Sequence, residues 1–215
     1  MKGLFLGIVL IIVVGFGGLV YRNAVEHPSQ PIACPMDARM CPDGTSVART
    51  GLSCTFPACP LPNVTLADIN VSFALPEGFT AAELPDASSV AAYESASSTA
   101  DIPPSSIIIR RFALQASSTA LATIRETAIG SPSGLPVSAT SFTSTVLGTH
   151  RFTIASIERF EGMVDTAYYL ARSTDVLRFD AIDRSVMNWT DPSLDTATLP
   201  AAVALRRLLT TLQGE

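Results

Sequence analysis

The stretch RFTIASIERFEGMVDTAYYLARSTDVLRFDAI, residues 151–182, predicts three consecutive β-strands, at Arg151–Phe160, Val164–Arg172 and Val176–Ile182. They are joined by short turns at Glu161–Gly162 and Ser173–Asp175. Turns this short join antiparallel neighbours, whereas parallel strands need a crossover of about a dozen residues or more. The sequence therefore predicts an antiparallel meander.

Other strands are predicted on the amino-terminal side of this meander. The clearest covers Ile69–Leu75, where apolar residues occupy every second position, as in a strand with one buried face. Further strands are predicted at Val90–Tyr93, Ile107–Leu114 and Phe142–Leu147. The last of these is joined to the meander by the short turn Gly148–His150, which makes a fourth antiparallel strand.

Two amphipathic helices complete the predicted domain. The first is capped by Ser117 and Ser118 and closed by Gly130, and the second covers Pro200–Leu212 with Thr198 as its cap. Their apolar stripes consist of Leu121, Ile124 and Ala128 in the first helix and of Leu205, Leu208, Leu209 and Leu212 in the second. Helices are needed to cover an exposed sheet face, so the expected fold is α+β, with an antiparallel sheet covered by helices.

The order of these elements resembles the PsbP-like fold, which the extrinsic photosystem protein shares with a Ran-binding nuclear import factor. The resemblance covers about residues 67–212. It is carried by VSFALPEGF at Val71–Phe79, the central helix, Tyr168 to Leu170, VLRFDAI at Val176–Ile182 and the terminal leucine helix. Members of this family serve as binding or assembly accessories. The resemblance implies such a role here, and no family site matches this chain residue by residue.

The amino-terminal segment predicts a transmembrane signal anchor at residues 1–22. Gly3–Tyr21 contains nineteen apolar or small residues without a charge. As a helix they reach about 28 Å, close to the roughly 30 Å of a bilayer core. A cleaved signal peptide is the alternative, but a cut after Ala24 places Arg22 where a small residue is required. Residues 23–33 are predicted to be a stalk.

A cysteine module is predicted at residues 34–60, CPMDARMCPDGTSVARTGLSCTFPACP. The segment has little to bury, so two disulfides among Cys34, Cys41, Cys54 and Cys59 are its expected stabilisation. A four-thiolate zinc site is the rival, but the six-residue gap between the first two cysteines is off its pattern. Three pairings stay open, and Cys34–Cys41 with Cys54–Cys59 is the least favoured because it leaves the central span unconstrained.

The same stretch resembles short cysteine modules of membrane-anchored bacterial proteins, with a Cys-Pro-Asp-Gly turn, a Val-x-Arg-x-Gly step and a closing Cys-Pro. The resemblance implies no activity, and a rigid spacer beside the membrane is the favoured interpretation. Oxidised cysteines indicate a compartment outside the cytoplasm. We therefore expect a single-pass protein of the cell membrane with a cytoplasmic amino terminus and an extracytoplasmic domain at residues 61–215.

Composition and motifs predict no chemistry for this domain. Fourteen basic and nineteen acidic residues give a net charge of −5, which argues against nucleic acid as a partner. A Ser-His-Asp site must use His150, because the other histidine, His27, lies in the stalk. Adjacent Arg110 and Arg111 are expected on opposite strand faces, so they cannot form a joint anion clamp. The aspartates that suggest a calcium loop are interpreted as solvated: Asp175, Asp180, Asp183, Asp191 and Asp195.

The sequence thus favours a membrane-anchored extracytoplasmic binding or assembly accessory protein. No catalytic activity, cofactor or metal is expected, and the partners are the membrane and an envelope protein or ligand of unknown identity. The alternative is an envelope hydrolase or a protein resembling a protease inhibitor, with the His150 turn or the cysteine module as its active element.

Overall fold

The structure is a computed structural model that describes residues 16–17, 34–41, 46–59, 61–96, 103–130 and 133–214. The predicted membrane anchor and stalk lie outside these residues, apart from Phe16 and Gly17. Among the described residues, no helix has the length and apolar character needed to cross a membrane. The chain divides into two compact units, residues 1–38 with 48–57 and residues 39–47 with 58–215.

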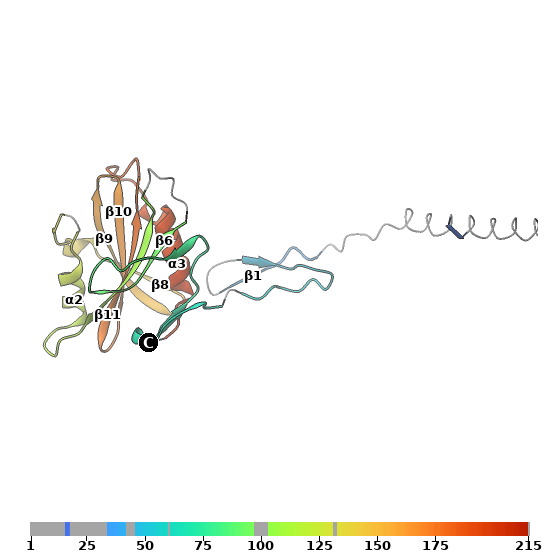
Figure 1. Ribbon diagram of the computed structural model, residues 1–215, viewed down its shortest axis with the longest axis horizontal. Helices are drawn as coiled ribbons and strands as arrows, with labels where there is room; N and C mark the ends of the chain where they lie inside the picture. The colour runs from blue at the N-terminus through green and yellow to red at the C-terminus, as the bar shows by residue number, and fades with distance from the viewer. Residues whose placement is uncertain are drawn as a thin grey trace, which may run out of the picture. The chain divides into compact units, whose positions relative to one another are not determined.

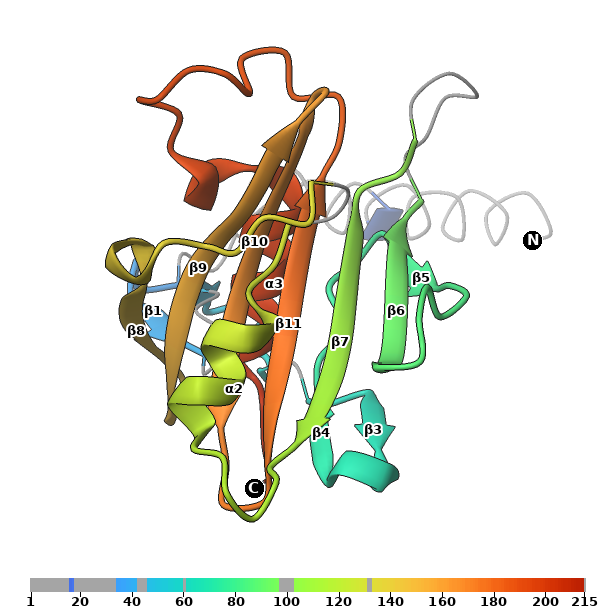
Figure 2. The same cartoon turned by 90° about the vertical axis from the view of Figure 1, so that its left-hand side faces the viewer.

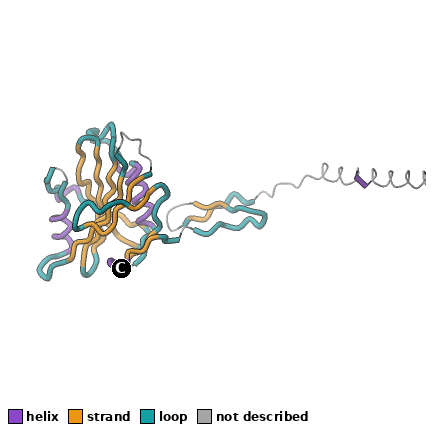
Figure 3. Tube along the Cα trace, in the orientation of Figure 1, coloured by secondary structure: helices purple, strands orange, loops and turns teal. Residues whose placement is uncertain are grey.

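An antiparallel sheet of seven strands dominates the larger unit (Figure 3). Its strand order is β5 (Phe79–Ala81), β6 (Ser89–Ser95), β7 (Ser106–Ala113), β11 (Asp175–Asp183), β10 (Met163–Ala171), β9 (His150–Phe160) and β8 (Thr143–Leu147). The last four of these form the predicted meander, and β9, β10 and β11 are seen side by side in Figure 1. Strand β11 also pairs with β7, which joins the two halves of the domain.

The strand predicted over Ile69–Leu75 is too long. Instead, β3 (Val64–Leu66) leads through a 3-10 turn, η1 (Ala67–Ile69), into β4 (Val71–Phe73), and β3 pairs with β4. Asn70 interrupts the run because its φ of 51° is left-handed, a conformation that asparagine tolerates better than most residues. The alternating pattern did identify the residues that are buried on β4, Val71 and Phe73.

The two α-helices lie on opposite faces of the sheet, as Figure 2 shows. Helix α3 (Pro200–Thr210) packs Leu205, Leu208 and Leu209 against the larger apolar core, and Leu212, which was predicted on the same helix, is buried in this core just beyond its end. Helix α2 (Ala120–Thr127) packs Ile124 onto the other face, in a smaller apolar cluster with Tyr169 and Val176. Because side chains alternate along a strand, each central strand serves both layers. The protein is therefore an antiparallel, sheet-dominated fold with two helices.

The caps of both helices differ from the prediction. Thr119, not Ser117 or Ser118, caps α2, since its hydroxyl accepts from the Ala122 N–H. Leu121 lies on the outer face of that helix and is 54% exposed. Thr198 does not cap α3, which is preceded by the 3-10 turn η3 (Thr196–Thr198).

The amino terminus of α3 is capped by a residue distant in sequence. The carboxylate of Asp183 accepts from the N–H groups of Ala201 and Ala202, at 2.8 and 3.3 Å. Burial raises the pKa of Asp183, and these two backbone bonds oppose that rise. The end of β11 thus holds α3 on the sheet.

The cysteine region contains two disulfides, Cys34–Cys54 and Cys41–Cys59. The least favoured pairing is therefore not the one formed. The short strands β1 (Ala38–Met40) and β2 (Ser46–Ala48) make a two-stranded sheet. In the smaller unit, Arg49 donates two hydrogen bonds to the Asp37 carboxylate, at 2.7 and 2.9 Å, and its guanidinium group lies over the Phe56 ring. Disulfides and polar contacts replace an apolar core here, as the composition predicts.

Candidate functional site

Two clusters of arginine and aspartate are built on the sheet, and neighbouring residues of β7 belong to different clusters. Arg110 donates to Asp86 and Asp180, whereas Arg111 donates to Asp175. Consecutive side chains of a strand point to opposite faces, so the expectation that Arg110 and Arg111 do not act jointly is met. The two clusters are therefore separate candidates for a functional site.

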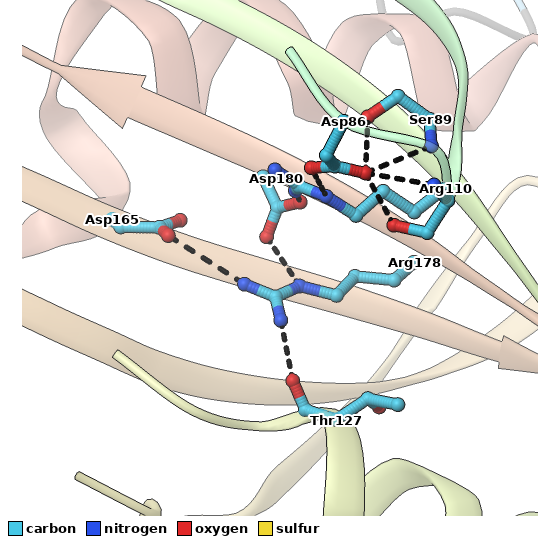
Figure 4. A network of polar contacts seen from close by, with 8 residues as sticks. Asp86, Ser89, Arg110, Thr127, Asp165, Arg178 and Asp180 are labelled. Carbon is cyan, nitrogen blue, oxygen red and sulfur yellow. Dashed lines mark hydrogen bonds and ion pairs between the residues drawn. The ribbon is translucent and has the colours of Figure 1, made fainter. Parts of the chain in front are cut away.

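The first cluster is a buried network on the sheet face that carries α2 (Figure 4). Arg178 donates from Nε to Asp180 at 2.6 Å, and its Nη2 lies 3.6 Å from Asp165. Arg110 bridges Asp180 to Asp86, which lies near the surface. Three carboxylates thus face two guanidinium groups, and Asp165 is the carboxylate left over.

Electrostatics separate the carboxylates of this network. Burial alone would raise the pKa of Asp86, but hydrogen bonds from Ser88 and Arg110 outweigh it and hold that pKa well below its usual range. Burial, with repulsion from Asp180 and Glu158, raises the pKa of Asp165 to about 8. This shift favours the protonated, uncharged form of Asp165, which reduces the excess negative charge.

The second cluster lies at a pocket of about 650 Å³. It collects residues from several elements: Asp68, Ile69 and Asn70 near η1, Arg111 of β7, His150 of β9, residues 170–175 around the β10–β11 turn, and Gly214. The Asp175 carboxylate is fully buried. It accepts hydrogen bonds from Nε and Nη2 of Arg172, at 2.6 and 2.8 Å, and from Nε of Arg111, at 2.7 Å. Burial alone would raise the pKa of Asp175, but its bonds to both arginines lower it. One carboxylate here faces two guanidinium groups.

The carboxy-terminal tail makes one wall of this pocket and is fixed to β4. Ser72 and Gln213 exchange two backbone hydrogen bonds, at 2.9 and 2.8 Å. Gly214 has a φ of +101°, and a Cβ at that position would collide with the Asn70 carbonyl oxygen. Only glycine allows the tail to approach so closely, so the wall is set by backbone geometry.

His150 is in the pocket, but its ring is committed to neighbouring groups. Nδ1 lies 3.3 Å from the Thr149 hydroxyl and Nε2 lies 3.3 Å from the Gly214 carbonyl oxygen. A neutral ring that donates from Nε2 and accepts at Nδ1 satisfies both. Within the described residues, neither nitrogen meets a serine hydroxyl or a carboxylate, so the arrangement that nucleophilic catalysis requires is not formed around His150.

The interpretation of the aspartates as solvated is wrong for three of the five. Asp175, Asp180 and Asp183 are buried and hold arginines or a helix terminus, whereas exposed Asp191 and Asp195 accept from nearby backbone N–H groups. The described part of the chain holds no group of three or more residues that could ligate a metal. The missed signal was charge inside otherwise apolar strands, as in IIIRRF and VLRFDAI, because a buried charge must be paired.

Comparisons with known proteins give a weak structural likeness and no match in sequence. No protein-family model matches the chain. A search of the curated proteins found no match either. A solved structure from Bacteroides thetaiotaomicron VPI-5482 is similar, with a TM-score of 0.44 and 12% sequence identity over 67% of this chain. The match covers 45% of that protein, so this chain spans less than half of its length. A likeness of this size assigns neither a fold family nor a function.

Proposed function

We propose that the protein is a non-catalytic, extracytoplasmic binding or assembly accessory that is anchored to the membrane by residues 1–22. The observation that carries this proposal is the pocket of Arg111, His150 and Arg172. It is large enough for a small molecule or a peptide side chain, since such sites measure about 300–1,000 Å³. Arg111 faces it with a partly exposed guanidinium group, and among the described residues His150 meets neither a serine hydroxyl nor a carboxylate.

The predicted topology supports the same role. The uncharged segment Gly3–Tyr21 is long enough to span a bilayer, and disulfides are typical of oxidising compartments outside the cytoplasm. Two helices on an antiparallel sheet are compatible with a PsbP-like domain, whose members act as accessories. In this proposal the cysteine region is a spacer between the membrane and the sheet.

Crosslinking in cells tests the binding role. The full-length protein and its R111Q and R125Q variants are crosslinked mildly in membranes, and the captured components are quantified. Arg125 is an exposed residue of α2 outside the pocket, so R125Q removes the same charge elsewhere. We expect a component that is captured by wild type and R125Q and reduced about tenfold, or 1.4 kcal/mol, by R111Q. No captured component, or equal capture by all three proteins, would refute the proposed binding site.

Thiol labelling of intact cells tests the topology. In the proposed orientation all four cysteines are outside the cytoplasm and oxidised, so a membrane-impermeant maleimide labels them only after reduction. Rapid labelling of all four before reduction would contradict the oxidised state. Protection that persists after reduction in intact cells, but not in lysed cells, would place the cysteines in the cytoplasm.

A further inference from the structure

The two arginines of the pocket differ in how fully they are used. Arg172 donates from Nε and Nη2 to Asp175 and from Nη1 to the Ile69 carbonyl oxygen, and its side chain is 11% exposed. Arg111 donates from Nε to Asp175, and its Nη1 is 3.5 Å from the Asp68 carbonyl oxygen. No described residue accepts from its Nη2, and its side chain is 41% exposed. Arg172 thus has a structural role, whereas Arg111 has N–H donors at the pocket for which no described residue is a close acceptor.

Among the described residues, the positive charges of this cluster exceed the negative charges that pair with them. A guanidinium does not lose its proton in a protein, so Arg111 and Arg172 carry two positive charges against the single charge of Asp175. Asp68 also lines the pocket, but it is exposed, and in the described structure its carboxylate is not within ion-pair distance of either arginine. One positive charge remains at the pocket wall.

From this geometry we infer that the pocket binds the carboxylate of a small organic acid, with the outer edge of Arg111 as its main contact. The inference rests on the proposed binding function and names the chemical class of the ligand. A planar carboxylate fits two parallel guanidinium N–H donors. A monoanion balances the single excess positive charge, whereas a dianion exceeds it by one negative charge.

Binding of three probes to the full chain in detergent micelles tests this inference. Benzoate carries the expected group, benzamide is its neutral counterpart, and inorganic phosphate is the competing anion. Calorimetry measures the dissociation constants, and the side-chain ¹⁵Nε resonance of arginine reports the site. Three variants are compared. R111Q removes the charge, R111K keeps the charge but lacks the two parallel N–H donors of a guanidinium group, and R125Q is the control outside the pocket.

We expect benzoate to bind wild type and R125Q alike, to shift the Arg111 resonance, and to bind R111Q about tenfold more weakly. Benzamide and phosphate should each bind at least about tenfold more weakly than benzoate, and R111K should lie between wild type and R111Q. R111K keeps the test decisive if R111Q fails to fold.

Each contrary outcome overturns the inference in a recognisable way. Equal binding of benzamide would show that the pocket does not select a negative charge. Tighter binding of phosphate would show that its ligand is a phosphate group. Both results leave the binding function standing. Unchanged binding of benzoate to R111Q and R111K removes Arg111 from the site. If no probe binds, the carboxylate is excluded, and the crosslinking experiment still decides separately whether the protein is a binding module.

Discussion

Arg110 and Arg111 are neighbours in sequence, but they serve two clusters that are unbalanced in opposite senses. The cluster of Arg110 has one carboxylate too many, and the cluster of Arg111 has one guanidinium too many. An extra carboxylate can be neutralised by a proton, as the raised pKa of Asp165 indicates. An extra guanidinium cannot be neutralised in this way. The first cluster is therefore closed, whereas the second leaves the partly exposed Arg111 with a positive charge that no described carboxylate balances.

Exposure follows the same division. In the closed cluster the Arg178 and Asp180 side chains are almost completely buried, and the Thr127 carbonyl oxygen, at the end of the covering helix α2, accepts a hydrogen bond from Arg178. In the open cluster Asp175 is buried, but Arg111 faces a pocket. Similar ion pairs can thus build a core or a site, and the difference lies in the charge count and in what covers them.

The largest effect is expected from Asp175→Asn. This change leaves Arg111 and Arg172 facing a neutral amide, so two guanidinium groups repel each other without a counter-charge. Breaking a buried ion pair from one side costs about 3–5 kcal/mol. Urea unfolding of the full chain in micelles should show a loss of this size, with less than about 0.5 kcal/mol for the exposed control D68N. A loss below about 1 kcal/mol for D175N would mean that Asp175 does not hold the pocket together.

Asp165→Asn tests whether a proton closes the first cluster. Because the folded-state pKa of Asp165 is raised to about 8, the folded protein holds this proton where the unfolded chain, with a pKa near 3.9, has released it. Stability should therefore fall as the pH rises from about 4 to about 8, by up to about 1.4 kcal/mol per pH unit. Between pH 5 and pH 7 this amounts to roughly 2–3 kcal/mol in wild type.

In D165N most of that slope should disappear, and Asp183, whose pKa is also raised, leaves a residual slope of the same sign. Asp191 has a lowered pKa, so the control D191N should keep the full slope in this window. A wild-type stability that is flat or rises from pH 5 to pH 7 would show that Asp165 is ionised in the folded state and that its cluster is not closed by a proton.

The sequence predicted the strands of the sheet better than it predicted the partners of the charged residues. The meander and the leucine face of α3 followed from strand periodicity, short turns and helical spacing, which are local signals. The prediction of one continuous strand at residues 69–75 is wrong because Asn70 takes a left-handed conformation. The alternation of apolar and polar residues does not reveal such a conformation. The prediction of Thr198 as the cap of α3 is wrong because the capping residue, Asp183, lies at the end of β11 and is distant in sequence.

Most of the candidate site could not be predicted from the sequence, because its contacts join residues that are distant in sequence. His150 was identified as the histidine to examine, but its partners, Thr149 and Gly214, give it no catalytic geometry. Asp175 was interpreted as solvated, yet the pairing of β11 with β7 brings Arg111 to it, and Arg172 of the adjacent turn is its second partner. Ion pairs that join distant strands depend on register, and only the fold supplies that.

The smallest effect, and the most direct comparison of the two clusters, comes from changing each neighbour to lysine. Arg110→Lys keeps the charge, but one ammonium group replaces a fork that bridges Asp86 and Asp180, and the loss of a charge-assisted bond costs about 1–2 kcal/mol. Arg111→Lys keeps its pairing with Asp175 at a more exposed position, so a loss below about 0.5 kcal/mol is expected in the absence of ligand. Thermal and urea unfolding at low salt measure both. Equal losses at the two positions would mean that Arg111 is as structural as Arg110, and the distinction between a closed and an open cluster would then fail.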